Sequence, residues 1–448
     1  MDAKPLCRVL VANRGEIAVR VIRACHQVGA EAVAVYSEAD ADAVHVRLAD
    51  DAKPIGPPQA AQSYLNIGTL IAAAKEAGAD AVHPGYGFLS ENAEFAGAVT
   101  AAGLTFVGPS AQAIAAMGNK ARARELAQEA GVPLVPGSGL VEDDDEAVTA
   151  AARVGYPVLV KAAAGGGGRG IRPARDEAEL RTVLESARRE AAASFGNGDV
   201  YVERSVARAR HIEVQVLADA HGQVVHCFER DCSLQRRRQK IFEEAPAPAL
   251  PQDLRDRMTS AAVRLARRVD YTGAGTVEFL VDGDDFYFME MNTRIQVEHP
   301  VTELVTGLDL VAEQLRVAAG QPLSVRQEDI ELRGHAVECR INAEDPAKRF
   351  LPKPGTVSTL EVPGGPGVRM DHALAPGAVV PPFYDSLVGK LCAWGTTRPQ
   401  ALARAGQALA ELEIGGLTTT APLHQRLLTV PDVIAGDYHT AWLEAFLA

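Results

Sequence analysis

A lysine at the end of an apolar segment, followed almost at once by a run of glycines, limits what this chain can fold into. Residues 158–160 are Val-Leu-Val, which predicts a buried strand ending at Lys161, and residues 162–170 read AAAGGGGRG. Because glycine has no side chain, the N–H groups of such a loop can approach an anion closely. The segment therefore predicts a flap over a phosphate group, although a flexible surface hairpin would have the same composition.

Neither of two common phosphate-binding signatures is present. No Gly-Lys-Ser/Thr closes the glycine run, as a Walker loop requires. After the first predicted strand, residues 9–12, the turn contains the single Gly15 in place of the three spaced glycines of a dinucleotide-binding loop. Binding of NAD is therefore disfavoured, despite a Rossmann-like pattern around this turn.

Length and charge narrow the class of protein. A chain of 448 residues exceeds what one hydrophobic core usually serves, so roughly two to four subdomains are expected. With 47% hydrophobic and 23% charged residues, the composition is typical of soluble globular proteins. The formal charge of −13 argues against nonspecific binding to nucleic acids or acidic membranes, which needs a basic surface. Any anion site must then be built locally.

Cysteines and apolar runs indicate the compartment. The six cysteines are scattered without a C-x-x-C pair, which predicts small core residues and neither a zinc site nor disulfides. The N-terminal apolar stretch is too brief for a signal peptide, and no later run reaches the about 20 apolar residues of a membrane span. We therefore expect a cytoplasmic protein.

The apolar patterns divide the chain into three regions. Strand-like and helix-like segments alternate through residues 1–118, which predicts an α/β domain with a parallel, Rossmann-like sheet. Residues 119–326 form a second region, in which residues 135–205 contain the glycine run and are interpreted as an insert that moves as a unit. Residues 333–448 carry Pro- and Gly-rich stretches, which predict a turn-rich, antiparallel α+β domain.

Two carboxylates face each other across a predicted hairpin. Residues 276–281 and 286–291 are strand-like and flank the turn 282–285. Glu278 and Glu290 then lie on neighbouring strands within reach of a shared cation, and Asn292 has the same strand parity as Glu290. Oxygen ligands of this kind suit Mg²⁺ or Mn²⁺. From these residues alone, an exposed strand pair with solvated acids is an equal alternative.

Three long motifs follow one another in the chain. Residues 83–92 read HPGYGFLSEN, residues 290–300 read EMNTRIQVEHP, and residues 334–346 read GHAVECRINAEDP. The middle motif places a cation, an amide and a carboxylate just beyond the paired acids. Such a polar run is unfavourable in a hydrophobic core but suits an anion site. In this order the motifs resemble those of biotin carboxylase, and the resemblance covers nearly the whole chain.

The resemblance implies an ATP-grasp enzyme with a mobile lid. Such an enzyme uses ATP and bicarbonate to carboxylate N1 of biotin through carboxyphosphate. Bicarbonate must approach the γ-phosphate, and two unit charges ~4 Å apart repel by ~4 kcal/mol at an effective dielectric constant near ~20. Several fixed positive charges are needed, and the resemblance implies that lysines, arginines and two Mg²⁺ or Mn²⁺ ions supply them.

The resemblance also implies the site residues. The ATP site would comprise Lys120, Lys161, Gly167, Gly168, Glu203, Arg204, Val206, His211, Gln235, Arg238, Glu278, Leu280 and Glu290. The metal ligands would be Glu278, Glu290 and Asn292. The bicarbonate site would comprise Lys240, Arg294, Gln296, Val297 and Glu298. The catalytic residues would be Lys240, Arg294, Arg340 and Glu298. Glu298 would deprotonate bicarbonate, and Arg340 would stabilise the enolate oxygen of biotin.

Some positions depart from the family pattern. Arg238 stands where a histidine is usual, Arg204 where a lysine is usual, and Ala163 and Ala164 where Ser and Gly are usual. Because arginine and lysine differ in shape, these changes affect nucleotide affinity more than chemistry. Considered without the resemblance, His211 is a structural strand histidine, and Arg340 is an exposed arginine on an alternating strand.

The resemblance finally implies partners. No Met-Lys-Met biotinylation segment occurs, so biotin is expected on a separate biotin carboxyl carrier protein. A homodimer and a partner carboxyltransferase are also expected, as in an acyl-CoA carboxylase of fatty acid biosynthesis. A pyruvate carboxylase-type or other biotin-dependent carboxylase is the alternative. A carbamoyl-phosphate synthetase-like ligase would lack residues 294–298 and Arg340, and a non-catalytic nucleotide-binding regulator would lack the chemistry residues.

Overall fold

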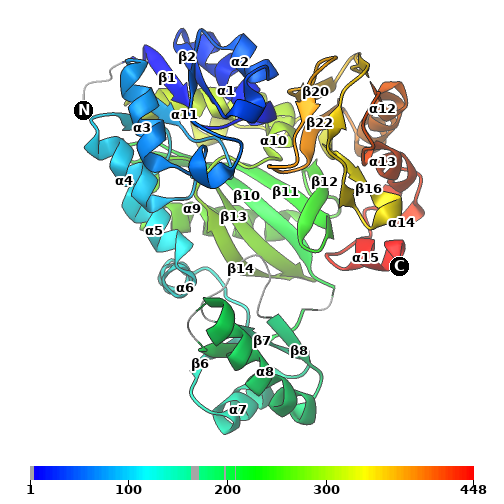
Figure 1. Cartoon of the computed structure of the whole chain (residues 1–448). Helices are drawn as coiled ribbons and strands as arrows, with labels where there is room; N and C mark the ends of the chain where they lie inside the picture. Colours follow the sequence, from blue (N-terminus) through cyan, green and yellow to red (C-terminus); the bar gives the residue numbers. More distant parts are fainter. Residues whose placement is uncertain (1–4, 163–170, 196–197, 207) are drawn as a thin grey trace.

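Three parts are visible in the computed structural model, which describes residues 5–162, 171–195, 198–206 and 208–448 (Figure 1). In this view the N-terminal domain lies above a central sheet, and the C-terminal domain lies to its right and contributes strands to it. The described residues of the predicted lid, 135–205, extend away from this body and are joined to it at one end. In the described residues, no helix combines the length and the apolar character needed to cross a membrane.

The N-terminal segments form a parallel sheet, as their alternation predicts. β1 (Arg8–Val11) pairs in parallel with β2 (Glu31–Tyr36) and β4 (Ala81–His83), in the strand order β3-β2-β1-β4-β5. Around them lie α1 (Gly15–Val28), α2 (Val44–Leu48), β3 (Asp51–Pro54), α3 (Ile67–Glu76), α4 (Ala93–Ala101), β5 (Thr105–Phe106) and α5 (Ala111–Gly118). The helix α1 buries one face against this sheet and ends at Gly29, whose φ of +82° suits glycine.

An antiparallel sheet of eight strands crosses the middle of the molecule, in the order β14-β13-β10-β11-β12-β15-β22-β20. Its strands are β10 (Arg210–Ala218), β11 (Val224–Arg236), β12 (Gln239–Ala245), β13 (Gly273–Asp282), β14 (Asp285–Asn292), β15 (His335–Asn342), β20 (Val368–His372) and β22 (Leu387–Gly395). The helices α9 (Gln252–Arg268), α10 (His299–Thr306) and α11 (Leu310–Ala318) pack around it. Because β12 pairs directly with β15, one sheet continues across the predicted boundary between the second and third regions.

The lid has its own small sheet and core. Its elements are β6 (Gly137–Val141), α7 (Asp144–Val154), β7 (Val158–Ala162), β8 (Ile171–Ala174), α8 (Glu177–Phe195) and β9 (Val200–Arg204). A separate apolar cluster that includes Val158, Leu180 and Val202 holds the two helices on the sheet. β7 confirms the strand predicted at Lys161, and β13 with β14 in the central sheet confirms the hairpin predicted at Glu278. Ala163, Ala164, Gly167 and Gly168 lie outside the described residues.

The C-terminal domain is turn-rich and antiparallel, as predicted. Short strand pairs are β16 (Glu344–Asp345) with β17 (Leu351–Pro352), β18 (Gly355–Thr356) with β21 (Val379–Val380) and β19 (Leu360–Glu361) with β23 (Glu413–Ile414). The helices are α12 (Arg398–Glu411), α13 (Ala421–Leu427), α14 (Pro431–Ala435) and α15 (Trp442–Leu447). All six cysteines are free; the core interpretation is right for five of them and wrong for Cys7, which is exposed.

Glu244 on β12 anchors this domain to the sheet. Its buried carboxylate accepts hydrogen bonds from Arg398 Nε at 2.6 Å and from the Tyr438 hydroxyl, and His335 Nε2 lies 2.5 Å away. Burial favours the neutral acid, but His335 and Arg398 outweigh it and hold the pKa of Glu244 at about 2, against an ordinary 4.5. The stabilisation is thus complete above pH 4.5 and is lost as the pH falls towards 2.

We expect the Glu244→Gln protein to lose less stability on acidification than the wild type, by about 3 kcal/mol, because its amide has no proton to take up. Urea unfolding at neutral pH and at progressively lower pH would measure the difference. Equal pH slopes for the two proteins would contradict this assignment.

Candidate active site

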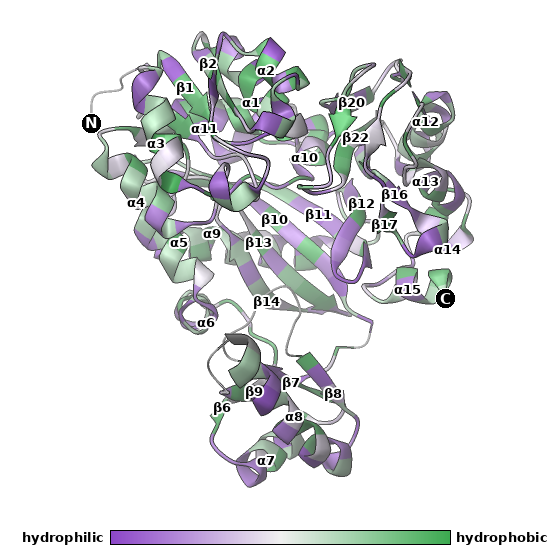
Figure 2. Ribbon diagram, in the orientation of Figure 1, coloured by the Kyte–Doolittle hydropathy of each residue, from purple (hydrophilic) through white to green (hydrophobic). Residues whose placement is uncertain are grey.

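Eight of the predicted site residues lie on six adjacent strands of the central sheet. The strands position His211 on β10, Gln235 on β11, Lys240 on β12, Glu278 and Leu280 on β13, Glu290 and Asn292 on β14, and Arg340 on β15. Figure 2 shows hydrophilic residues in the middle of β10, β11 and β12, where a sheet core is normally apolar. The segment that follows β14, residues 293–298, brings Arg294, Gln296, Val297 and Glu298 to the same place.

The two hairpin acids are cross-strand partners. Glu278 is paired with Glu290 and is only 4% exposed, and Asn292 Nδ2 donates to Glu278 Oε1 at 2.9 Å. Glu290 is solvent-exposed at its surface. Partial desolvation is the largest cause that raises the pKa of Glu290, and the negative charge of Glu278 is the second. The alternative of two solvated acids is therefore wrong for Glu278. Two repelling carboxylates and an amide form an oxygen-rich set that fits a hard divalent cation.

Lys240 stands among three carboxylates. Its Nζ donates to Glu213 at 2.6 Å, to Glu278 at 2.9 Å and to Glu298 at 2.7 Å. Burial opposes the charged form, but the carboxylates outweigh it and raise the pKa of Lys240 well above its ordinary value. The ammonium is therefore a permanent charge at the centre of the site.

Glu298 is fully buried immediately before α10. Its carboxylate accepts from Lys240 on one oxygen and from Arg340 Nη2 at 2.9 Å on the other. Burial favours the neutral acid, yet Lys240 and Arg340 hold the pKa of Glu298 well below its ordinary range. The residue is thus ionised at neutral pH, which the predicted role as a base demands.

Arg340 is not an exposed strand arginine. Its side chain is 17% exposed and donates to Glu243 Oε1 at 2.5 Å as well as to Glu298. The apolar alternation of β15 leaves this one guanidinium on the site side of the strand. The solvent-exposed alternative is therefore wrong.

Arg294 explains why the motif at residues 83–92 belongs with the motif at residues 290–300. Arg294 Nε donates to Glu91 Oε2 at 2.9 Å, and the Thr293 N–H donates to Glu91 Oε1 at 3.1 Å. The guanidinium also donates to Gln296 Oε1 at 2.7 Å and to Asn292 Oδ1 at 3.3 Å. The N-terminal domain thereby orients the arginine of the predicted bicarbonate site.

The remaining predicted residues in the described part of the chain lie outside the strands of the central sheet. Lys120 is exposed and is the first residue of α6 (Lys120–Glu129). Desolvation and the positive charge of Lys161 lower the pKa of Lys120, and the negative charge of Glu290 only partly offsets them. Arg204 donates to the Tyr287 hydroxyl at 2.8 Å, so it is directed towards the β13–β14 hairpin. Among the described residues, two predicted ones make no side-chain contact that defines a role: Val206, half-buried after β9, and Arg238, exposed in the β11–β12 turn with φ of +67°.

Sequence reasoning missed three charged residues that complete the cluster. Glu213 and Arg230 are fully buried and paired at 2.6 Å, and Glu243 holds Arg340. A signal was present for one of them: Glu213 follows His211 at the next same-face position of the same strand, β10. His211 Nε2 lies 3.0 Å from Glu278, so this histidine belongs to the cluster.

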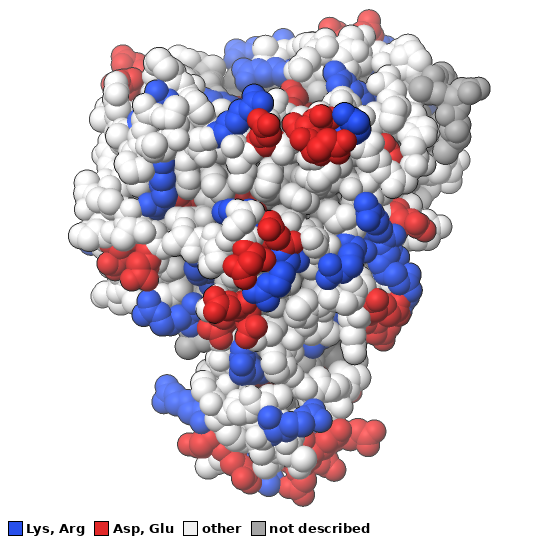
Figure 3. All heavy atoms as spheres, turned by 180° about the vertical axis from the view of Figure 1, so that it is seen from behind, with Lys and Arg blue, Asp and Glu red and all other residues white. Residues whose placement is uncertain are grey.

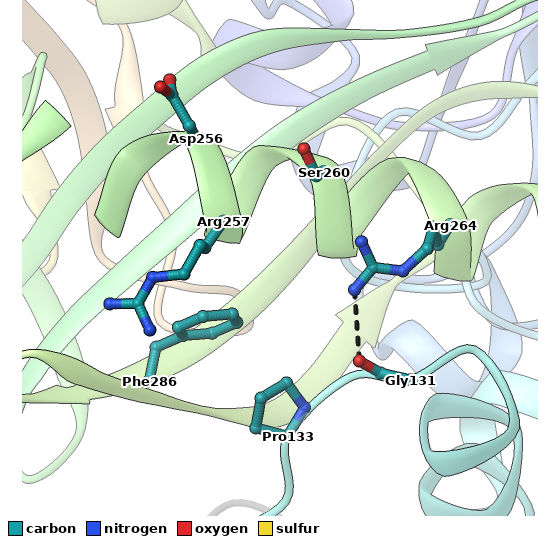
Figure 4. Close-up of a pocket in the computed structure, with 7 residues that line it drawn as sticks. All are labelled: Gly131, Pro133, Asp256, Arg257, Ser260, Arg264 and Phe286. Atoms are coloured by element: carbon teal, nitrogen blue, oxygen red, sulfur yellow. Dashed lines mark hydrogen bonds between the residues drawn. The ribbon is translucent and has the colours of Figure 1, made fainter. Parts of the chain in front are cut away.

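A surface hollow in the described part of the chain lies elsewhere. It has a volume of about 440 Å³ and is lined by Gly131, Pro133, Asp256, Arg257, Ser260, Arg264 and Phe286 (Figure 4). None of these is a predicted site residue. Figure 3 shows acidic and basic side chains interspersed on the face turned away from the view of Figure 1. The charge cluster on the central sheet is therefore the candidate active site.

Comparisons with known proteins agree with this arrangement. Residues 5–114 match the family model of the biotin carboxylase N-terminal domain, residues 119–326 that of the carbamoyl-phosphate synthase L chain ATP-binding domain, and residues 338–445 that of the biotin carboxylase C-terminal domain. Biotin carboxylase 1 of Bacillus subtilis is 54% identical over 442 residues, which cover 98% of each chain. A pyruvate carboxylase subunit of Methanothermobacter thermautotrophicus is 50% identical over 440 residues, which cover 98% of this chain and 90% of that one.

A solved structure gives the same result. It is the biotin carboxylase domain dimer of Hydrogenobacter thermophilus 2-oxoglutarate carboxylase, in complex with MgADP, ADP and bicarbonate. The two structures superpose with a TM-score of 0.92 at 48% sequence identity, and the match covers 99% of this chain and 98% of that one. The carbamoyl-phosphate synthase likeness concerns one domain, whereas the flanking domains and the full-length identity are those of biotin carboxylases. The ATP-grasp fold and the predicted family are thus confirmed, and the chain belongs to the biotin carboxylase family of ATP-dependent ligases.

Proposed function

We propose that the clustered charges on the central sheet carry out the carboxylation of biotin presented by a separate carrier protein. The observation that carries the proposal is the ionised, buried Glu298 held between Lys240 and Arg340. Bicarbonate and ATP are the substrates that this family requires, and the relative from Hydrogenobacter thermophilus binds bicarbonate and MgADP. The reaction would be the first half-reaction of a biotin-dependent carboxylase.

The nucleotide would lie between the body and the lid. Lys120 and Lys161 would contact its phosphates together with Gly167 and Gly168, and His211, Gln235 and the segment from Glu203 to Val206 would contact the nucleoside. Glu278, Glu290 and Asn292 fit two Mg²⁺ or Mn²⁺ ions by their oxygen chemistry. When bound, the ions would neutralise charge on the transferred phosphoryl group.

Glu298 would act as the base once bicarbonate has bound. An anion bound by Lys240, Arg294, Gln296 and the Val297 backbone shares the positive charge that otherwise stabilises the Glu298 carboxylate. The basicity of Glu298 therefore rises at the moment a proton must be accepted. The proton moves from bicarbonate to a Glu298 oxygen, and the bicarbonate oxygen attacks the γ-phosphorus to give carboxyphosphate and ADP.

Arg340 would serve the second step. Carboxyphosphate breaks down to CO₂ and phosphate, phosphate accepts the N1 proton of biotin, and N1 attacks CO₂. Negative charge develops on the ureido oxygen of biotin during this attack. Arg340 carries a permanent charge and is held by Glu243 and Glu298, so it can stabilise that oxygen without first reorganising.

Partners and acceptor extend the proposal. A homodimer, a biotin carboxyl carrier protein and a separate carboxyltransferase are proposed, and a dimer is known for the Hydrogenobacter thermophilus relative. We propose an acyl-CoA as the final acceptor, with a 2-oxo acid as the alternative that relatives named for pyruvate and 2-oxoglutarate support. Copurification with the native transferase would decide between them. The free cysteines support a cytoplasmic location.

The wild-type protein should release ADP only when bicarbonate is present, and free biotin should stimulate the release. Arg294→Ala should lower this rate by roughly 10²–10³-fold, because it removes a preorganised donor from the anion site. A coupled assay of ADP release measures both effects. Arg257→Ala, an exposed change on α9 in the hollow of Figure 4, is the control and should leave the rate unchanged. ATP turnover that is indifferent to bicarbonate and biotin would contradict the proposal.

A further inference from the structure

Glu203 of the lid holds two cations at once. The residue is on β9 and is 1% exposed. One carboxylate oxygen accepts from Arg124 Nη1 at 2.5 Å, and the other accepts from the Lys161 ammonium. Lys161 is the lysine for which a phosphate contact is proposed above, so in this structure it is paired with an internal carboxylate.

A single cation would create a conflict at this position. Removing the partner of a buried carboxylate leaves an uncompensated charge, which is strongly destabilising. If Lys161 were the sole partner of Glu203, its movement to a nucleotide phosphate would leave that carboxylate unpaired. The affinity for nucleotide would then be reduced by the cost of this vacated ion pair.

Arg124 removes the conflict. It lies on α6, one turn after Lys120, and its guanidinium also lies over the Tyr201 ring, 5.5 Å from the centroid. Its side chain is 24% exposed and that of Lys161 is 21% exposed, so both cations are at the border of the site. A guanidinium is always charged and is well suited to a fixed carboxylate pair, whereas a lysine is a point charge on a flexible stem that can be redirected.

We propose that Arg124 is a positioning residue that keeps Glu203 paired, so that Lys161 is free to transfer to the nucleotide phosphates. The inference rests on the proposed role of Lys161 at those phosphates. The ion pair between Arg124 and Glu203 also joins α6 of the body to β9 of the lid. Arg124 itself touches neither phosphate nor bicarbonate in this scheme.

Titration calorimetry with MgADP tests the proposal. Arg124→Gln should weaken MgADP binding by roughly tenfold to a hundredfold, because Glu203 then retains Lys161. In turnover the KM for ATP should rise by the same factor, while kcat at saturating ATP should change by less than about threefold. Arg124→Lys should restore most of the affinity because a cation is returned to Glu203. Arg122→Gln is the matched control on the same helix, where Arg122 is exposed and pairs with Glu125, and it should bind MgADP like the wild type.

The double variant Arg124→Gln/Glu203→Gln, compared with Glu203→Gln alone, separates this role from a general loss of structure. Without a carboxylate at position 203, no cation is needed there, so removing Arg124 should no longer weaken MgADP binding. Wild-type affinity in Arg124→Gln, or the same loss on removing Arg124 with and without the Glu203 carboxylate, would overturn the proposal. A wild-type protein that binds MgADP but lacks bicarbonate-dependent turnover would instead refute the proposed function and leave this binding comparison interpretable.

Discussion

Replacing Glu298 by glutamine should lower bicarbonate-dependent, biotin-stimulated ADP release by about 10²–10⁴-fold, the range for loss of a general base. Glutamine keeps the size of the side chain but cannot accept the bicarbonate proton. Lys240 and Arg340 would still stand on either side, so the anion site would keep its positive charge. MgADP affinity should therefore change little, and the loss should appear in kcat.

The control for this variant is Glu331→Gln, a solvent-exposed change paired only with Arg333 at 3.1 Å among the described residues. Its rate should equal that of the wild type. A Glu298→Gln protein that kept its rate within about tenfold would assign the proton transfer to another group, since loss of a general base costs more than this.

The largest effect on stability is expected at Arg230. This arginine is fully buried and donates to Glu213 at 2.6 Å, to Gln215 at 2.8 Å, to Thr302 at 3.0 Å and to Thr276 at 3.1 Å. Arg230→Met should lower the free energy of unfolding by about 3–5 kcal/mol, because a buried carboxylate and three polar side chains lose their common partner. The shift of the urea midpoint at fixed pH measures it.

A double variant tests the cause of that loss. Arg230→Met/Glu213→Gln also removes the buried carboxylate that has lost its guanidinium partner and keeps Lys240 as a hydrogen-bond donor, and it should recover part of the stability that the single variant loses. Arg264→Met on α9, whose guanidinium bonds only to exposed backbone carbonyls in the described part of the chain, should cost far less. Equal losses for Arg230→Met and the double variant would show that packing, and not the charge, is responsible.

Local patterns were sufficient to predict the elements that position the site. The alternation at residues 276–281 and 286–291 predicts the hairpin, and a register shift between Glu278 and Phe279 places Glu278 opposite Glu290. The glycine run likewise predicts the end of β7 at Lys161 within one residue. Such features depend on neighbouring residues, so periodicity and turn residues carry them.

Long-range pairing could not be predicted in the same way. Nothing near Glu91 indicates that it orients Arg294, which is 203 residues further on. Glu213, Arg230 and Glu243 appear in the sequence as charges on mixed polar and apolar strands, and only the assembled sheet shows that each has a charged partner. The family resemblance predicts the site residues, whereas the side chains that hold them in place are found only in the structure.

The direct pairing of β12 with β15 has a consequence for dividing this protein into pieces. A fragment that stopped before β15 would expose the hydrogen-bonding edge of β12, a template for aggregation. It would also strip the scaffold from Lys240 and Glu243, although both precede the missing part. Lys240 and Arg340 thus lie on neighbouring strands that pair directly, so backbone hydrogen bonds set the spacing between the two cations.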